Sequence, residues 1–198
     1  WYVAAFSDAV TRTPIARELL DIPVVFYRKE DGGPVALVDR CSHRFAPLST
    51  GALVGDDLQC GYHGLRFDCN GRCVANPHND NKPLPAANID AFTLHERYGF
   101  VWIWPGEAEL ADPALIPPFH FLGDDKTWRV LKGHLHVKGN YQLVSDNLLD
   151  LTHAPYLHPG FKMPGVTPEQ QLAATTAKVE KGERSVHYYR HRTGLPPN

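Results

Sequence analysis

Two short segments, Cys41-Ser42-His43-Arg44 and Cys60-Gly61-Tyr62-His63, decide how this chain must fold. They follow the pattern C-x-H, sixteen intervening residues, and then C-x-x-H. Each segment carries one thiol and one imidazole, the side chains that bind soft and borderline transition metals. We therefore expect a fold in which two loops meet at one metal site.

The distribution of these ligands between the loops distinguishes two kinds of metal site. In a Rieske [2Fe–2S] centre, one iron keeps two Cys ligands and the other takes two His ligands, so each loop can donate one of each. A structural zinc ion can also take two Cys and two His, but zinc fingers usually place both Cys in one turn and both His in the other. The mixed pairs favour the iron–sulfur cluster, with zinc as the alternative.

The residues around these ligands carry a family resemblance. Residues 41–49 (CSHRFAPLS) and 58–68 (LQCGYHGLRFD) resemble the cluster loops of Rieske non-haem iron oxygenases, most closely the oxygenase components of the dicamba and vanillate O-demethylase group. Those loops usually carry proline where this chain has Ser42 and Gly61, a difference that changes loop stiffness but no ligand. The resemblance implies a Rieske cluster bound by Cys41, His43, Cys60 and His63.

Composition excludes several classes of partner. The 198 residues include 20 Lys and Arg against 22 Asp and Glu, which gives a formal charge of −2. This near neutrality gives no reason to expect nucleic acid or an anionic membrane as a partner. No apolar stretch approaches the roughly 20 residues of a membrane-spanning helix. Because two of the four cysteines are assigned to the cluster, we expect no disulfide framework and a cytoplasmic location.

The first hundred residues indicate antiparallel β structure. Segments rich in Val, Ile, Tyr and Phe alternate with the turn sequences Asp31-Gly32-Gly33, Asn70-Gly71 and Tyr98-Gly99. Cys69 and Cys73 flank the second turn, and we interpret them as small apolar residues, with a redox pair as the alternative. We expect a mainly β (α+β) chain with a Rieske domain at residues 1–105, a Pro-bearing connector at 106–127 and a second domain at 128–198.

The second domain begins with a change of periodicity. Residues 128–137 alternate like a strand, on which His134 and His136 would share a solvated face. Residues 140–153 follow a helical period that Pro155 is predicted to end. An inward apolar stripe is expected at Leu143, Leu148 and Leu151. Residues 176–179 and 185–191 are predicted to form a hairpin, where Tyr188, Tyr189 and His191 either line a cavity or pack.

The predicted helix carries a second group of potential metal ligands. Asn147, Asp150, His153 and His158 resemble the mononuclear iron motif of the same oxygenases, in which the two His bind Fe(II). Two His and one carboxylate leave one face of the iron for O₂. The resemblance places Asn147 near the iron and makes Asp150 a bridge to His63 of a neighbouring subunit. It thereby implies a head-to-tail homotrimer. Asp146 is interpreted as an exposed helical carboxylate.

The resemblance implies reductive activation of O₂. A ferredoxin or an NAD(P)H-dependent reductase would supply single electrons, and the product would be a hydroxylated or O-demethylated aromatic compound. The second domain would be the start of an α+β helix-grip catalytic domain. The family's third iron ligand is a downstream Asp, but no Asp follows Asp150. We therefore expect this sequence to be a fragment.

Two other functions compete with this interpretation. A Rieske-type electron carrier would end soon after the cluster domain and would lack the motif in residues 140–158. Respiratory-type loops also usually carry an extra Cys pair, and none lies beside Cys41 or Cys60. A zinc-stabilised module without catalytic activity is the third possibility, and it would show no EPR signal from a cluster.

Overall fold

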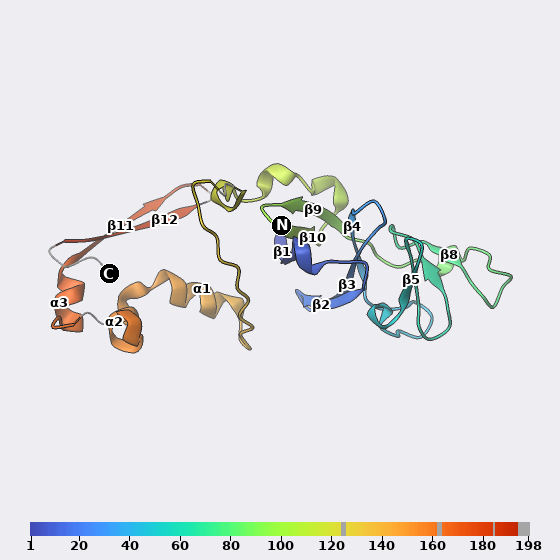
Figure 1. Cartoon of the computed structure of the whole chain (residues 1–198), viewed down its shortest axis with the longest axis horizontal. Helices are drawn as coiled ribbons and strands as arrows, with labels where there is room; N and C mark the ends of the chain where they lie inside the picture. Colours follow the sequence, from blue (N-terminus) through green and yellow to red (C-terminus); the bar gives the residue numbers. More distant parts are fainter. Residues whose placement is uncertain (124–125, 162–163, 184, 194–198) are drawn as a thin grey trace. The chain divides into compact units, whose positions relative to one another are not determined.

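The computed structural model describes residues 1–123, 126–161, 164–183 and 185–193. The chain divides into two compact units, Trp1–Leu131 and Lys132–Asn198 (Figure 1). Strands dominate the first unit, so the prediction of a mainly β chain is confirmed. None of the helices in the described ranges has the length and apolar character needed to cross a membrane.

The described part of the first unit contains three antiparallel sheets, ordered β1-β10-β9, β2-β3-β4 and β5-β6-β7-β8. Their strands are β1 (Tyr2–Phe6), β2 (Ile15–Leu19), β3 (Ile22–Arg28), β4 (Pro34–Val38), β5 (Ala52–Val54), β6 (Asp57–Gln59), β7 (Arg66–Phe67), β8 (Cys73–Ala75), β9 (Thr93–Arg97) and β10 (Phe100–Trp104). Short 3-10 helices join them at η1 (Ser7–Ala9), η2 (Leu48–Thr50), η3 (Pro85–Ala87), η4 (Ala108–Leu110), η5 (Pro113–Leu115) and η6 (His120–Gly123).

Strand β3 is apolar on both faces because it separates two cores. Alternate side chains of a strand point to opposite sides of the sheet. Val25 and Tyr27 accordingly belong to the core that contains Cys41 and Cys60, and Phe26 belongs to the core formed with β1 and β10. Figure 1 shows β3 and β4 between β10 on one side and β5 on the other. The middle sheet therefore packs against the core that contains the two candidate cysteine ligands.

The predicted hairpin turns are present. Gly32 (φ +86°) joins β3 to β4, Gly71 (φ +75°) lies between β7 and β8, and Tyr98 (φ +59°) with Gly99 (φ +77°) joins β9 to β10. Positive φ values at two central residues give the turn twist that matches antiparallel strands. The turn between β2 and β3 has the same geometry at Leu20 (φ +54°) and Asp21 (φ +61°), where the sequence offers no glycine.

Arg28 ties three segments of the first unit together. Its guanidinium makes two bonds to the Glu96 carboxylate, at 2.6 and 2.9 Å. It also donates to the carbonyl oxygens of Ser7 (2.7 Å), Val10 (2.7 Å) and Gly32 (2.6 Å). A planar guanidinium presents five donors in a fixed geometry, which an ammonium group cannot reproduce.

Replacing Arg28 with Lys is therefore expected to lower the free energy of unfolding by about 2–3 kcal/mol. Arg17→Lys is the matched control, because Arg17 is exposed and donates only locally, to the carbonyl of Ala16. Denaturant unfolding of both variants measures the difference. Equal stabilities for the two variants would contradict the proposed importance of the Arg28 contacts.

The Arg28–Glu96 pair also predicts acid sensitivity. The hydrogen bond from Arg28 lowers the pKa of Glu96 below its ordinary value of 4.5. A carboxyl group whose pKa is lower in the folded state stabilises the fold above its unfolded pKa, and this contribution is lost as the pH falls through the folded pKa. Below pH 4.5 the unfolding free energy should therefore decline more steeply in the natural protein than in Glu96→Gln. Parallel pH profiles from denaturant titrations would refute this assignment.

Among its described residues, the second unit has three short α-helices and one hairpin. The elements are α1 (Tyr141–Leu149), η7 (Leu151–His153), α2 (Ala154–Leu157), η8 (Pro159–Phe161), α3 (Pro168–Ala173), β11 (Thr175–Lys181) and β12 (Val186–Arg192). Strands β11 and β12 pair in antiparallel register, so the predicted hairpin is confirmed. The strand predicted at residues 128–137 is wrong, because the structure assigns no strand to this segment. A strand requires a hydrogen-bonded neighbour, which alternation in sequence cannot supply.

The predicted helix at residues 140–153 is interrupted. Helix α1 ends at Leu149, because Asp150 has extended backbone angles (φ −97°, ψ 90°) and its carboxylate caps η7 by accepting from the Thr152 amide. Pro155 lies in the first turn of α2 rather than after a helix, and this is a position that tolerates the missing N–H. The predicted inward stripe is also wrong, since Leu143 and Leu148 are exposed.

Candidate functional site

The first loop that carries candidate ligands follows β4. The Cys41 amide donates to the Ala46 carbonyl (2.9 Å), and the Phe45 amide donates back to the Cys41 carbonyl (2.8 Å). Phe45 has φ +58°, a left-handed conformation that is unusual for a bulky side chain. Buried Asp39 fixes the two ends of the loop by accepting from the amide (2.7 Å) and the hydroxyl (2.6 Å) of Ser49.

The second loop, after β6, repeats this hydrogen-bond pattern. The Cys60 amide donates to the Leu65 carbonyl (2.8 Å), and the Gly64 amide donates to the Cys60 carbonyl (3.0 Å). Gly64, at φ +76°, occupies the position that Phe45 holds in the first loop. A Cβ atom on Gly61 would lie 3.2 Å from the Thr50 carbonyl oxygen, so the two loops approach closely here. Both loops thus share one hydrogen-bond pattern, and their Cys residues lie in the same core.

The two thiols form a buried pair. Cys41 is 2% exposed and Cys60 is 1% exposed. Burial raises the pKa of the Cys41 thiol, the backbone N–H of His43 lowers it, and a hydrogen bond with the Cys60 thiol raises it. The backbone N–H groups of His43 and Arg44 both lower this pKa, which is the direction that would favour a metal-bound thiolate.

The two imidazoles form a second pair, nearer to solvent. The ring centroids of His43 and His63 are 4.6 Å apart with 63° between the ring planes. Desolvation and the charges of His43, His78 and Arg44 lower the pKa of His63, which favours the neutral form that binds metals. The Tyr62 ring lies against His63 at a tilt of 41°, with ring centroids 3.8 Å apart.

This separation of sulfur from nitrogen fits a two-iron cluster. Each pair can serve one iron, which is the Rieske arrangement of ligands. Within the described ranges, no three or more His, Cys, Asp or Glu side chains lie close enough together to hold one metal ion. A tetrahedral zinc site needs four ligands around one ion. The donor set therefore suits a [2Fe–2S] cluster better than the zinc alternative.

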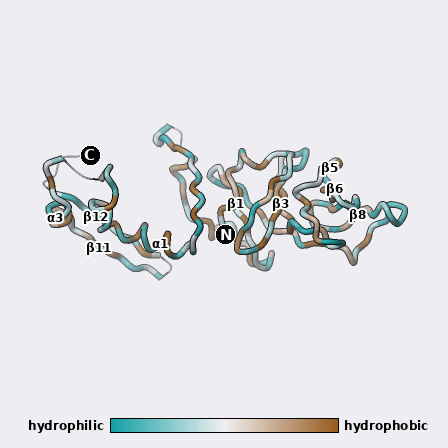
Figure 2. The backbone as a smooth tube through the Cα atoms, turned by 90° about the horizontal axis from the view of Figure 1, so that it is seen from below, coloured by the Kyte–Doolittle hydropathy of each residue, from teal (hydrophilic) through white to brown (hydrophobic). Residues whose placement is uncertain are grey.

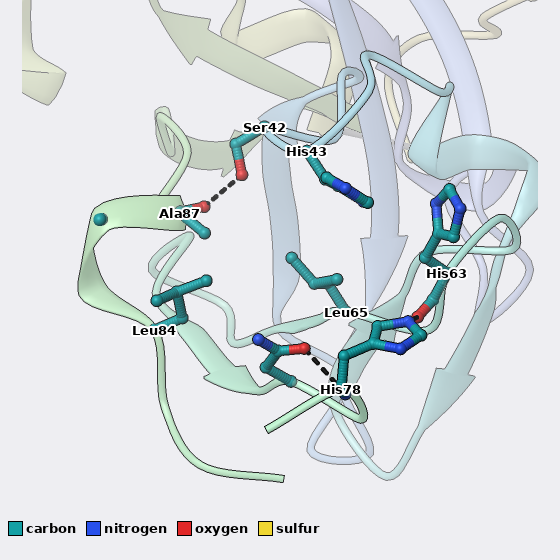
Figure 3. A pocket seen from close by; sticks show the side chains of 9 residues that line it. Ser42, His43, His63, Leu65, His78, Leu84 and Ala87 are labelled. Atoms are coloured by element: carbon teal, nitrogen blue, oxygen red, sulfur yellow. Dashed lines mark hydrogen bonds between the residues drawn. The ribbon is translucent and has the colours of Figure 1, made fainter. Parts of the chain in front are cut away.

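Contacts from more distant segments support both loops. The Ser42 hydroxyl donates to the Ala87 carbonyl at 2.6 Å, so serine at this position anchors the first loop to η3. His78, which the sequence motifs do not include, lies with its Nε2 atom 3.2 Å from the His63 carbonyl oxygen. A hollow of about 510 Å³ lies in this region, and Figure 3 shows the side chains that line it. Its lining residues are Ser42, His43, His63, Leu65, Asn76, His78, Leu84, Ala86 and Ala87.

The other two cysteines share the core of Cys41 and Cys60 but lie outside the two loop motifs. Cys73, in β8, is buried in the core below the loops, and Cys69 packs against that core from the turn. All four cysteines of the chain are free thiols. The burial of Cys73 and the packing of Cys69 fit the interpretation of both as small apolar residues.

The second unit brings His153 and His158 together. Their ring centroids are 5.3 Å apart, and His153 Nδ1 lies 2.6 Å from the Asp150 carbonyl oxygen. Because a carbonyl only accepts, this contact places the proton on Nδ1 and leaves Nε2 available to a metal. The Asp150 carboxylate contacts Thr152 instead, and the hydroxyl of Thr152 lowers the pKa of Asp150. The main chain of Asp150 therefore orients the imidazole, and its side chain caps the turn.

The remaining predicted residues of the second unit lie in open positions. Asn147 and Asp146 are exposed on α1, and His134 and His136 are exposed in an extended segment rather than on a strand. Over the hairpin, a hollow of about 570 Å³ is lined by Thr176, Ala177, Lys178, Tyr188, Tyr189, Arg190 and His191. Arg190 also donates to the Leu151 carbonyl at 3.1 Å, a contact between hairpin and η7 for which the sequence carries no signal.

Comparison with known proteins assigns both parts of the chain. Residues 1–93 match the model of the Rieske [2Fe-2S] domain, and residues 137–198 match that of the vanillate O-demethylase oxygenase C-terminal domain. The oxygenase component of dicamba O-demethylase from Stenotrophomonas maltophilia is 48% identical over 158 residues, covering 80% of this chain and 46% of the relative. A vanillate O-demethylase oxygenase subunit from Pseudomonas sp. (strain HR199) is 42% identical over 158 residues, covering 80% of this chain and 44% of the relative.

Solved structures give the same assignment. The crystal structure of dicamba monooxygenase bound to dicamba matches with a TM-score of 0.87 and 41% identity, over 96% of this chain and 55% of that chain. The structure of dicamba monooxygenase with non-heme iron and dicamba matches with a TM-score of 0.78 and 42% identity, over 94% of this chain and 51% of that chain. The chain thus spans about half the length of the relatives it matches. It belongs to the Rieske non-haem iron oxygenases, with the oxygenase components of dicamba and vanillate O-demethylases among its relatives.

Proposed function

We propose that the protein is the oxygenase component of a system that uses O₂ to hydroxylate or O-demethylate a small aromatic substrate. The observation that carries the proposal is the occurrence of two sites in one chain. Two loops bring together a buried Cys pair and a His pair nearer to solvent, and His153 and His158 meet beside Asp150. Its relatives are named as O-demethylase oxygenase components. An electron carrier alone has no need of the second site.

Each site has its own ligands in this proposal. The [2Fe–2S] cluster is held by Cys41, His43, Cys60 and His63, and Fe(II) is held by His153 and His158. When bound, the cluster supplies one-electron transfer and the iron supplies reductive activation of O₂. The chain itself buries the thiols, lowers the pKa of His63 and fixes the His153 proton on Nδ1.

Oligomer formation belongs to the same proposal. Asp150 would bridge the iron site to His63 of a neighbouring subunit in a head-to-tail trimer, and Asn147 would lie near the iron. Two large side chains beside the cluster loops, Phe45 (69% exposed) and Tyr62 (63% exposed), support a protein contact at this surface. Exposed aromatic residues are typical of protein interfaces.

We also propose a domain division and a cellular setting. The Rieske domain would occupy residues 1–105, the connector 106–127 and the catalytic part 128–198. The two family matches and the division into compact units support this scheme. Electrons would come from a ferredoxin or an NAD(P)H-dependent reductase. Four free thiols support a reducing compartment such as the cytoplasm.

Metal analysis combined with a product assay tests the proposed function. The holoenzyme should contain acid-labile sulfide and more iron than one cluster accounts for, and its reduced form should give a Rieske EPR signal near an average g of about 1.9. Incubation with a reductase, O₂ and methoxylated aromatic acids should release formaldehyde. Cluster iron alone, without formaldehyde or any hydroxylated product, would favour the electron carrier. Zinc without sulfide would refute both functions.

A further inference from the structure

We propose that His78 is a positioning residue that fixes the orientation of His63 and so determines how firmly the cluster is held. This inference rests on the proposed [2Fe–2S] site. His78 lies outside the C-x-H and C-x-x-H motifs, on the polar loop that follows β8, which is teal in Figure 2. The argument depends on a contact with the main chain of His63 rather than on metal binding by His78 itself.

The contact has a defined direction. His78 Nε2 lies 3.2 Å from the His63 carbonyl oxygen, and a carbonyl can only accept, so His78 donates through Nε2–H. The ring centroids of His63 and His78 are 6.1 Å apart, so the two side chains are not stacked face to face. Figure 3 shows the His78 ring directed at the main chain of His63. His78 therefore restrains the backbone that carries the ligand.

The loop that carries His78 is held together by the hydrogen bonds of one residue, Asn76. Asn76 follows β8, and its Oδ1 atom accepts from the His78 amide at 3.0 Å. The Asn76 amide donates to the Lys82 carbonyl (3.2 Å), and the Asn76 carbonyl accepts from the amides of Asn79 and Asn81 (both 3.0 Å). These bonds close the turn, so His78 projects from a fixed base and loses little conformational entropy when it binds His63.

The second metal-binding loop benefits from such a restraint near its tip. Hydrogen bonds of Cys60 hold the base of the loop, where that thiol is buried. His63 lies farther out, beside largely exposed Tyr62 and at the edge of the 510 Å³ hollow. Close packing cannot restrain the loop on its hollow side, so a directed hydrogen bond must do so. Outer groups of this kind orient metal ligands and affect metal retention about 10–100-fold.

Two amide variants separate the hydrogen bond from other roles of His78. In His78→Gln the amide nitrogen occupies the position of Nε2 and can still donate to the His63 carbonyl oxygen. In His78→Asn the side chain is one carbon shorter and does not reach that oxygen. We expect the Gln variant to match the natural holoenzyme in cluster EPR line width and in the rate of cluster loss to a chelator. The Asn variant should show broadened EPR lines and cluster loss about tenfold faster.

Equal behaviour of the two variants would overturn the inference, whether both retain the cluster or both lose it. Thermal unfolding of both proteins serves as the folding control, and we expect their midpoints to agree. A natural protein without any Rieske EPR signal would instead refute the proposed function, so the two failures are distinguishable.

Discussion

Replacing Asp150 with Asn is expected to reduce substrate-dependent O₂ consumption about 10–100-fold while leaving the cluster EPR signal unchanged. Asn also caps helices, so its side-chain oxygen can still accept from the Thr152 amide, and its main-chain carbonyl can still accept from His153 Nδ1. The variant therefore keeps the turn and removes the negative charge. A large loss of activity would assign that charge a role between the two metal sites.

Asp146→Asn is the matched control for this experiment. Asp146 lies one helical turn earlier on α1 and is exposed, so its replacement removes the same charge from the same segment. Normal O₂ consumption is expected for the control, with iron and sulfide contents of both variants equal to those of the natural holoenzyme. Comparable losses in the two variants, or full activity in Asp150→Asn, would rule out a specific role for the Asp150 carboxylate.

Replacing Gly51 with Ala is expected to lower the free energy of unfolding of the first unit by about 3 kcal/mol and to prevent normal cluster incorporation. Gly51 follows η2, and a Cβ atom there would lie 2.0 Å from the carbonyl oxygen of Gln59. The main chain fixes the position of the Cβ atom and contains the Gln59 oxygen, so no side-chain rotation can relieve the overlap. Because Gln59 precedes Cys60, the displacement would be transmitted to a proposed cluster ligand.

Gly55→Ala distinguishes this overlap from backbone strain. Gly55 has φ +60°, and its Cβ atom would have no neighbour within 4 Å, so only the left-handed conformation opposes alanine. That cost is about 1–2 kcal/mol. Gly51 has φ −87°, which alanine readily adopts. Denaturant unfolding and the sulfide content per chain measure both effects. A smaller loss for Gly51→Ala than for Gly55→Ala would contradict the steric argument.

Local features of the sequence predicted much of the first unit. The turns at Gly32, Gly71 and Gly99 could be predicted because positive φ values favour glycine, and the spacing of Cys and His identified the candidate cluster ligands. The turn at Leu20-Asp21 could not be predicted, since neither residue prefers the left-handed region strongly. There, the pairing of β2 with β3 imposes the conformation.

Predictions for the second unit failed where a periodic pattern was extended too far. Residues 150–153 continue the helical spacing of α1, but the Asp150 carboxylate competes for the backbone by capping the next turn. Residues 128–137 alternate like a strand without a partner strand in the part of the chain that the structure describes. Periodicity describes which faces of a segment are apolar, whereas hydrogen-bond partners come from elsewhere in the chain.

The sequence by itself determined the identity of the candidate ligands, the mainly β fold and the family, because residue type, spacing and turn preference are properties of short segments. Only the tertiary structure decided that the thiols pair in a core while the imidazoles pair toward solvent. It also decided which distant groups hold the two loops: Ser49 bonds to Asp39 at the first loop, and His78 bonds to His63 in the second. Such contacts arise when burial of the apolar faces of β3 brings remote segments together, and no local pattern records which of them will meet.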